Sequence, residues 1–157
     1  MEYVLVLRWL HILGATVLIG TGAGIAFFML MSHRSGDPRL IAHTASTVVT
    51  ADWIFTATAV LAQPITGVLL AMEVGWELTE LWILASIGLY LFIGLCWLPV
   101  VRIQIRLRNL AEEAADRSEP LPPRYHTLSR IWLTLGFPAF ASILTILWLM
   151  IARPTWS

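Results

Sequence analysis

The sequence predicts an all-α protein, a polytopic four-helix transmembrane bundle with both termini on the outer side of the membrane. Three observations predict this fold. The chain of 157 residues is 58% hydrophobic and 13% charged, with a mean hydropathy of +0.77, which lies outside the range of soluble globular proteins. Four intervals carry no formal charge, and each is long enough to cross a hydrocarbon core of about 30 Å. Most arginines lie in two of the segments between these intervals.

The uncharged intervals are residues 9–33, 53–72, 81–101 and 131–152. The predicted spans are residues 4–31, 53–72, 81–101 and 131–152, within a single domain of residues 1–157. At about 1.5 Å of rise per residue, each span covers the core of a bilayer. A turn at Gly36 and Asp37 precedes a helix start that continues into the second span. Residues 118–123 predict a break before the fourth span.

The charges orient the spans. Segments 32–52 and 102–130 hold eight of the ten basic residues, all of which are arginine. The segment between the second and third spans carries Glu73, Glu77 and Glu80 and no basic residue. Because loops rich in arginine stay on the cytoplasmic side, the two arginine-rich segments are predicted to be cytoplasmic. The acidic segment and both termini are then predicted to lie outside.

His11 is the one histidine within a predicted span. Ionisable side chains in hydrocarbon are costly, so an intramembrane histidine is a candidate functional group. Gly14 and Ala15 lie one turn further into the membrane on the same helix face, and Arg8 lies one turn further out. A histidine beside small residues, with a cation one turn away, is typical of a haem ligand whose propionates meet an arginine. This pattern favours His11 as a ligand of haem iron, either five-coordinate or completed by a weaker ligand or by another subunit.

A polar face on the second span is predicted to look into the bundle. Asp52, Thr56, Gln63 and Thr66 recur at spacings that place them on one side of a helix. Gln63 and Thr66 fall at the depth of His11, whereas Asp52 lies at the inner boundary and is expected to pair with an arginine. Pro64 is expected to kink the helix and to free a carbonyl that needs a partner. The predicted cofactor-binding residues are His11, Arg8, Gly14, Gln63 and Thr66.

A second interpretation gives His11 a structural role. It would then be hydrogen-bonded to Gln63 or Thr145 and hold two helices together. The protein would be a non-enzymatic membrane subunit or a small transporter, with Gln63, Thr66 and Asp52 along a polar path. Whether the chain is an enzyme stays open.

Other residues offer weaker clues. A metal site from His33, Asp37 and His43 is a third alternative, although their spacing fits no compact ligand motif. Cys96, the single cysteine, is expected to be a buried apolar residue without a chemical role. A formal net charge of zero gives no reason to expect a nucleic-acid partner.

Several motifs distributed along the chain point to a family. They are LHILGA (10–15), GTGAGIAFFM (20–29), ADWIFTA (51–57), QPITG (63–67), WLPVVRIQIRLR (97–108) and GFPAF (136–140). With these motifs the chain resembles, over essentially its whole length, a family of predicted bacterial integral membrane proteins known as domain of unknown function 2269. The resemblance implies a multi-pass protein of four helices in the bacterial inner (cytoplasmic) membrane and no particular activity; the outer side on which the charges place both termini is then the periplasm.

A wider resemblance concerns the first span. Its Arg8, Trp9 and His11 are similar to the first helix of the HemJ-type protoporphyrinogen oxidases and the copper-resistance D membrane proteins. In the HemJ-type proteins that histidine is implicated in binding b-type haem, and this role carries over to His11 alone. Those oxidases also use lysine in later helices, and this chain has none, so protoporphyrinogen oxidation is not implied.

Together, the residues and the resemblance favour a redox membrane protein that binds haem b through His11. Its expected partners are the lipid bilayer and either a quinone or a partner membrane subunit with which it exchanges electrons. Gly20 and Gly24 have the spacing that lets transmembrane helices approach closely, and a homo-oligomer is a further expectation.

Overall fold

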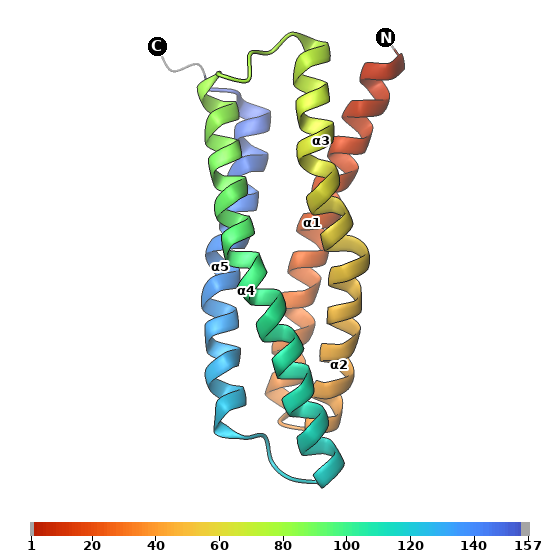
Figure 1. Ribbon diagram of the computed structural model, residues 1–157, viewed down its shortest axis with the longest axis vertical. Coiled ribbons are helices and arrows are strands. Elements are labelled where there is room, and N and C mark those ends of the chain that lie inside the picture. Colours follow the sequence, from red (N-terminus) through yellow and green to blue (C-terminus); the bar gives the residue numbers. More distant parts are fainter. Residues whose placement is uncertain (1, 155–157) are drawn as a thin grey trace.

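In the computed structural model, which describes residues 2–154, the chain folds into long helices that run side by side (Figure 1). The elements are α1 (Glu2–Ser35), α2 (Pro38–Ala51), the π-helical turn η1 (Asp52–Thr56), α3 (Ala57–Val74), α4 (Leu81–Arg117) and α5 (Pro123–Ala152). No β-strand occurs among the described residues. Since α2, η1 and α3 form one continuous rod, residues 2–154 contain four helical rods long and apolar enough to cross a membrane. The predicted all-α, four-helix transmembrane fold is confirmed.

Local sequence explains where the helices begin and end. The Asp37 carboxylate accepts a hydrogen bond from the Arg39 backbone N–H at 2.9 Å, and Pro38 occupies the first turn of α2, where its missing N–H leaves no bond unmade. Gly75 and Ser118 adopt the left-handed conformation just after α3 and α4, which is how many helices close. The predicted helix start before the second span and the predicted break before the fourth are both observed.

One half of the bundle is close-packed, and we call it the arginine-rich half. It contains the turn between α1 and α2 and the connection between α4 and α5, at the bottom of Figure 1. The core cluster lies in this half and consists of Ile25, Met29, Ile41, Ala42, Ala45, Val48, Val100, Ile103, Leu107, Ala111, Tyr125 and Trp132. Leu107 and Tyr125 are fully buried there. The helix α2 fills the space between α1 and α4, so that all the rods meet.

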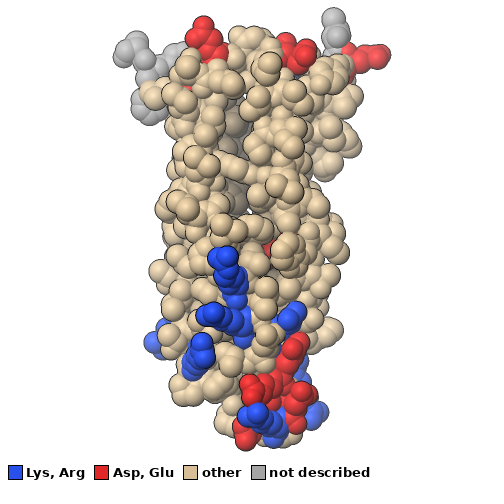
Figure 2. Space-filling view, viewed as in Figure 1, with Lys and Arg blue, Asp and Glu red and all other residues tan. Residues whose placement is uncertain are grey.

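The other half, which we call the terminal half, is built differently. Here α1 packs against α3 and α4 packs against α5, while α3 and α4 approach each other at few points. Both described ends of the chain lie at this end of the molecule (Figure 1). A space-filling view shows the surface hollowed between the two helix pairs in this half (Figure 2). In the terminal half, the space between the two helix pairs is therefore not filled by a close-packed core.

The charged residues separate along the rods. Figure 2 shows arginines gathered in the lower part of the molecule, together with Asp and Glu side chains, and Asp and Glu at the upper edge of this face. Large apolar side chains such as Phe28, Leu95 and Phe137 are exposed, as expected of a surface that faces lipid. Most arginines thus lie away from the described ends of the chain, as predicted, while Arg8 and Arg153 lie in the terminal half. Which end faces the cytoplasm stays a prediction.

Candidate functional site

His11 on α1 is held by a side chain of α3. Its Nδ1 lies 3.0 Å from Thr66 Oγ1. Thr66 Oγ1 also lies 2.8 Å from the carbonyl oxygen of Ala62, one helical turn back. A hydroxyl has only one proton to give, so in the arrangement in which Thr66 donates to Ala62 it accepts from His11, and Nδ1 carries the imidazole proton. The neutral ring then presents Nε2 as an unprotonated nitrogen.

A second contact fixes the backbone of the same residue. Gln63 Nε2 donates a hydrogen bond to the carbonyl oxygen of His11 at 2.8 Å. Two glycines make this approach of α1 and α3 possible. A Cβ on Gly14 would lie 2.6 Å from Gln63 Nε2, and a Cβ on Gly67 would lie 3.1 Å from His11 Cε1. A methyl group at Gly14 would displace the Gln63 amide and one at Gly67 would press on the imidazole ring, so glycine at both places favours these contacts.

The structure therefore brings four predicted site residues together: His11, Gly14, Gln63 and Thr66. Their use in binding a cofactor stays a prediction. Thr145, which was considered as another partner of His11, instead donates its hydroxyl to Ala141 within its own helix at 2.9 Å.

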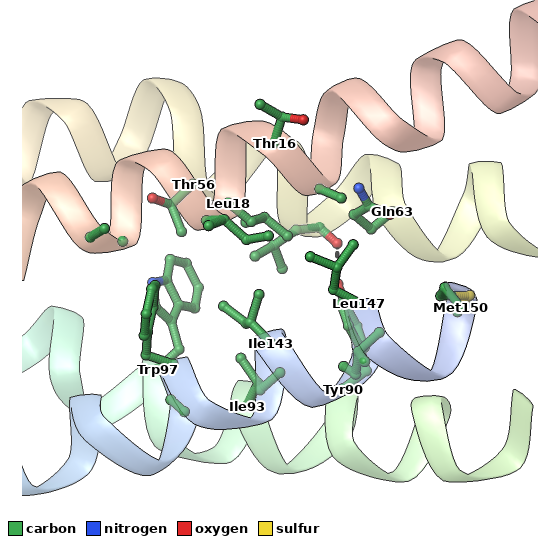
Figure 3. A pocket seen from close by; sticks show the side chains of 18 of the residues that line it. Thr16, Leu18, Thr56, Gln63, Tyr90, Ile93, Trp97, Ile143, Leu147 and Met150 are labelled. Atoms are coloured by element: carbon green, nitrogen blue, oxygen red, sulfur yellow. Dashed lines mark hydrogen bonds between the residues drawn. The ribbon is translucent and has the colours of Figure 1, made fainter. Parts of the chain in front are cut away.

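A cavity of about 580 Å³ lies between the α1–α3 pair and the α4–α5 pair, and His11 lines it. This volume is within the range of small-molecule and cofactor sites. Figure 3 shows side chains of both pairs facing the space between them, with Leu18 and Gln63 on one side and Ile93, Ile143 and Leu147 on the other. The walls are mainly apolar, and polar groups are concentrated towards the two ends.

Cations and aromatic rings surround the end of the cavity in the terminal half. Arg8, Arg153, Trp76 and Trp82 line it there. The Arg153 guanidinium lies 4.3 Å above the ring of Trp76, a cation–π contact that holds it in place. Arg8 forms no ion pair with any of the residues that the structure describes. Sequence reasoning identified Arg8 and missed Arg153, whose only signal was a basic residue directly after the last apolar run.

Tyr90 bridges the gap between α3 and α4. Pro64 has no N–H, so the carbonyl of Val60, four residues earlier, loses its usual helical partner. The hydroxyl of Tyr90 donates to that carbonyl. The prediction that Pro64 frees a carbonyl in need of a partner is confirmed. Tyr90 itself could not be identified beforehand, because it lies in an unbroken apolar run.

At the opposite end of the cavity lies a group that we call the deep polar layer: Asp52, Thr56, Trp97, Gln104 and Trp132. Asp52, Thr56, Gln104 and Trp132 are at most 9% exposed. The side chains of Thr56, Gln104 and Trp97 approach the Asp52 carboxylate. None of Thr56 Oγ1, Trp97 Nε1, Gln104 Oε1 and Trp132 Nε1 has a partner with ordinary hydrogen-bond geometry, so the contacts with Asp52 are at most weak hydrogen bonds.

Asp52 does not make the expected salt bridge. Within the described residues the ion pairs are those of Arg108 with Glu112 and of Arg117 with Glu113. Asp52 instead opens the π-helical turn η1, where its carbonyl accepts the N–H of Ala57. It is buried beside the cavity. Single π-helical turns are frequent at functional sites.

The expectations for the remaining residues have mixed outcomes. The metal site from His33, Asp37 and His43 is wrong, because no three His, Cys, Asp or Glu residues in 2–154 are placed to hold an ion. His33 stacks on Tyr125, with ring centroids 5.5 Å apart. Cys96 is buried and unpaired, as expected.

Gly20 and Gly24 are available on the outside of α1. Nothing in the described chain lies within 4 Å of a Cβ added to either. They therefore do not mediate packing within this chain. A homo-oligomer that uses them stays a prediction.

The comparisons with known proteins bear on this architecture. A family model described as "Predicted integral membrane protein (DUF2269)" matches residues 5–154, and the chain belongs to this family. No curated protein and no solved structure matches the chain. The predicted family is confirmed, and with it a multi-pass integral membrane protein. The resemblance of the first span to HemJ-type proteins stays a prediction.

Proposed function

We propose that this member of a family of predicted integral membrane proteins is a b-type haem-binding redox protein of the bacterial inner membrane, with His11 as an axial ligand. One observation carries the proposal. His11 lines a large cavity, and its Nδ1 lies 3.0 Å from Thr66 Oγ1, so that with the Thr66 proton on the Ala62 carbonyl Nε2 is the unprotonated nitrogen. Metal-binding histidines are commonly oriented in this way, with the second ring nitrogen donating to an oxygen.

The remaining surroundings of His11 also fit haem. The backbone of Gly67 leaves room for the imidazole ring, so that the orientation of the ring is fixed by packing as well as by Thr66. The walls of the cavity are mainly apolar, as the porphyrin faces require. Arg8 and Arg153 at one end would hold the two propionates through charge-assisted hydrogen bonds.

Met150 is a candidate for the sixth ligand. It lines the same cavity from α5, as Figure 3 shows. A thioether is a known axial ligand opposite histidine and raises the reduction potential of the iron. Tyr90 is a poorer candidate because its hydroxyl is already bonded to the carbonyl of Val60.

When bound, haem supplies reversible one-electron chemistry. The residues of this chain would orient the ligand, exclude water from it and keep the proton on His11 Nδ1. The electron partner would be a quinone or a partner subunit in the same membrane.

An absorption spectrum of the purified protein tests the proposal. We expect a Soret band in the wild type, loss of that band in His11→Ala and its retention in His43→Ala, which removes an exposed histidine of α2. A colourless wild-type protein prepared with added haem would overturn the proposal. So would a band of equal intensity in His11→Ala.

A non-enzymatic membrane subunit or small transporter is the second candidate. It is favoured by the two hydrogen bonds through which Gln63 and Thr66 already connect α3 to His11. In that case the protein carries no pigment, and His11→Ala lowers the stability of the bundle or its assembly with a partner.

A further inference from the structure

The deep polar layer offers hydrogen bonds that the protein itself does not use. The indole N–H of Trp132 and the acceptor Gln104 Oε1 are buried without a partner, and the indole N–H of Trp97 approaches the Asp52 carboxylate without ordinary hydrogen-bond geometry. The Asp52 carboxylate beside them is paired with no arginine in the described chain. Buried polar groups without partners are costly and need an explanation. All four residues line the cavity, so one occupant can satisfy them.

The mixture of donors and acceptors narrows the chemistry of that occupant. An anion would be repelled by Asp52, and a metal ion would find no set of three ligands among residues 2–154. An organic cation would suit Asp52 and the aromatic rings but would leave the indole N–H of Trp132 unpaired. A ligand that both donates and accepts hydrogen bonds, and that is otherwise apolar, matches the whole layer.

We propose that the deep polar layer binds the headgroup of a hydroquinone, the reduced form of a membrane quinone. Its hydroxyl protons donate to Asp52 and Gln104, and its oxygens accept from Trp97 and Trp132. The indole rings provide flat apolar surfaces for the aromatic ring of the ligand. The mainly apolar cavity receives the hydrocarbon tail.

The terminal half also provides an entrance from the bilayer to the cavity. Between α3 and α4 there are few contacts, and the hydroxyl of Tyr90 makes the hydrogen bond across this gap. The surface is hollowed on this side (Figure 2). A ligand dissolved in the bilayer can therefore enter sideways, without passing through water. A role of the hydroquinone as electron donor rests on the proposed haem, whereas its binding does not.

The test measures binding of a defined probe, decylubiquinol kept reduced, to the protein in lipid nanodiscs by isothermal titration calorimetry. We expect saturable binding to the wild type. Trp132→Phe retains an aromatic ring but removes one donor, and Asp52→Asn removes the negative charge; each should weaken binding about tenfold. Thr58→Val is the matched control, because Thr58 does not line the cavity and its hydroxyl bonds only within its own rod; the affinity of this variant should equal that of the wild type.

The outcomes separate this inference from the proposed function. Binding that persists in His11→Ala and is weakened in Trp132→Phe supports the hydroquinone site even if no haem is found. Equal affinity in the wild type, Trp132→Phe and Asp52→Asn would overturn it. It would also be overturned if tetraphenylphosphonium binds in a manner that needs Asp52 while decylubiquinol does not bind, since the layer would then recognise a cation.

Discussion

The arginine-rich half and the terminal half are built from the same rods but differ in what separates them. In the arginine-rich half, α2 lies between α1 and α4, and Leu107 and Tyr125 are fully buried. In the terminal half, α3 packs against α1, and a cavity of about 580 Å³ lies between this pair and the pair of α4 and α5. The comparison indicates that the close packing of the arginine-rich half stabilises the fold, which allows the terminal half to contain an internal cavity.

The largest expected effect comes from removing volume in the packed half. Leu107→Ala should lower the free energy of unfolding by about 2–5 kcal/mol, because the surrounding side chains cannot close the void. Leu18 lines the existing cavity, so the matched change Leu18→Ala only enlarges that cavity. It should lower the free energy of unfolding by about 1 kcal/mol. Unfolding of the purified protein in mixed micelles of increasing SDS content measures both. Equal losses would contradict the division into two halves.

A smaller effect is expected where α1 and α3 meet. Gly14→Ala places a methyl group against the amide of Gln63, so the hydrogen bond from Gln63 to the His11 carbonyl should break. The free energy of unfolding should then fall by about 1–2 kcal/mol. Gly24→Ala is the control, since its methyl group meets nothing within 4 Å and alanine favours helix. The same SDS titration compares them. The contact would be dispensable if both variants were as stable as the wild type.

Tyr90→Phe should have a weaker effect still. It removes the hydroxyl that bonds to the carbonyl of Val60 and leaves that carbonyl exposed to the cavity. Hydrogen bonds between transmembrane helices contribute about 0.6 kcal/mol on average, and we expect a loss of this size. Because α3 and α4 would then separate more easily, decylubiquinol should also bind and leave faster, which stopped-flow tryptophan fluorescence measures. Unchanged rates would show that the gap is not the entrance.

The smallest expected change in stability is that of Thr66→Val, which keeps the shape of the side chain but removes the acceptor for His11 Nδ1. Stability should fall by about 0.6 kcal/mol or less. If haem is bound, its midpoint potential should shift, because the hydrogen bond tunes the basicity of the ligand. A redox titration followed at the Soret band checks this shift against Thr58→Val, whose hydroxyl bonds only within its own helix.

Much of this architecture could be predicted from the sequence because it follows from local physics. Hydropathy and charge located the four rods, Asp37 and Pro38 fixed a helix start, and counting residues from the boundaries placed Gln63 and Thr66 at the depth of His11. These conclusions need only the rise of a helix and the cost of burying charge.

What could not be predicted depends on packing between distant segments. Gln104 lies in a stretch of arginines that suggests a solvated surface, yet it is 2% exposed, because it faces the interior beside Asp52. The salt bridge of Asp52 was predicted wrongly because it was inferred from nearby arginines in the sequence, whereas the bundle buries Asp52 beside the cavity. Tyr90 carries no local signal and Arg153 only its place after the last apolar run, since the gap and the opening where they lie exist only in the assembled bundle.

The turn η1 also constrains how this chain can change its length. A π-helical turn is one residue longer than the α-helical turn it replaces, so a deletion within Asp52–Thr56 would leave a regular helix without breaking the rod. Because one turn would replace another, the segments before and after the deletion would keep nearly the same orientation. Deleting one of the exposed residues Trp53, Ile54 or Phe55 should therefore preserve folding, membrane insertion and the cavity. Deleting a residue of the regular helix between Thr56 and Gln63 should instead rotate one segment against the other by about 100°, which would separate the two polar regions of the cavity.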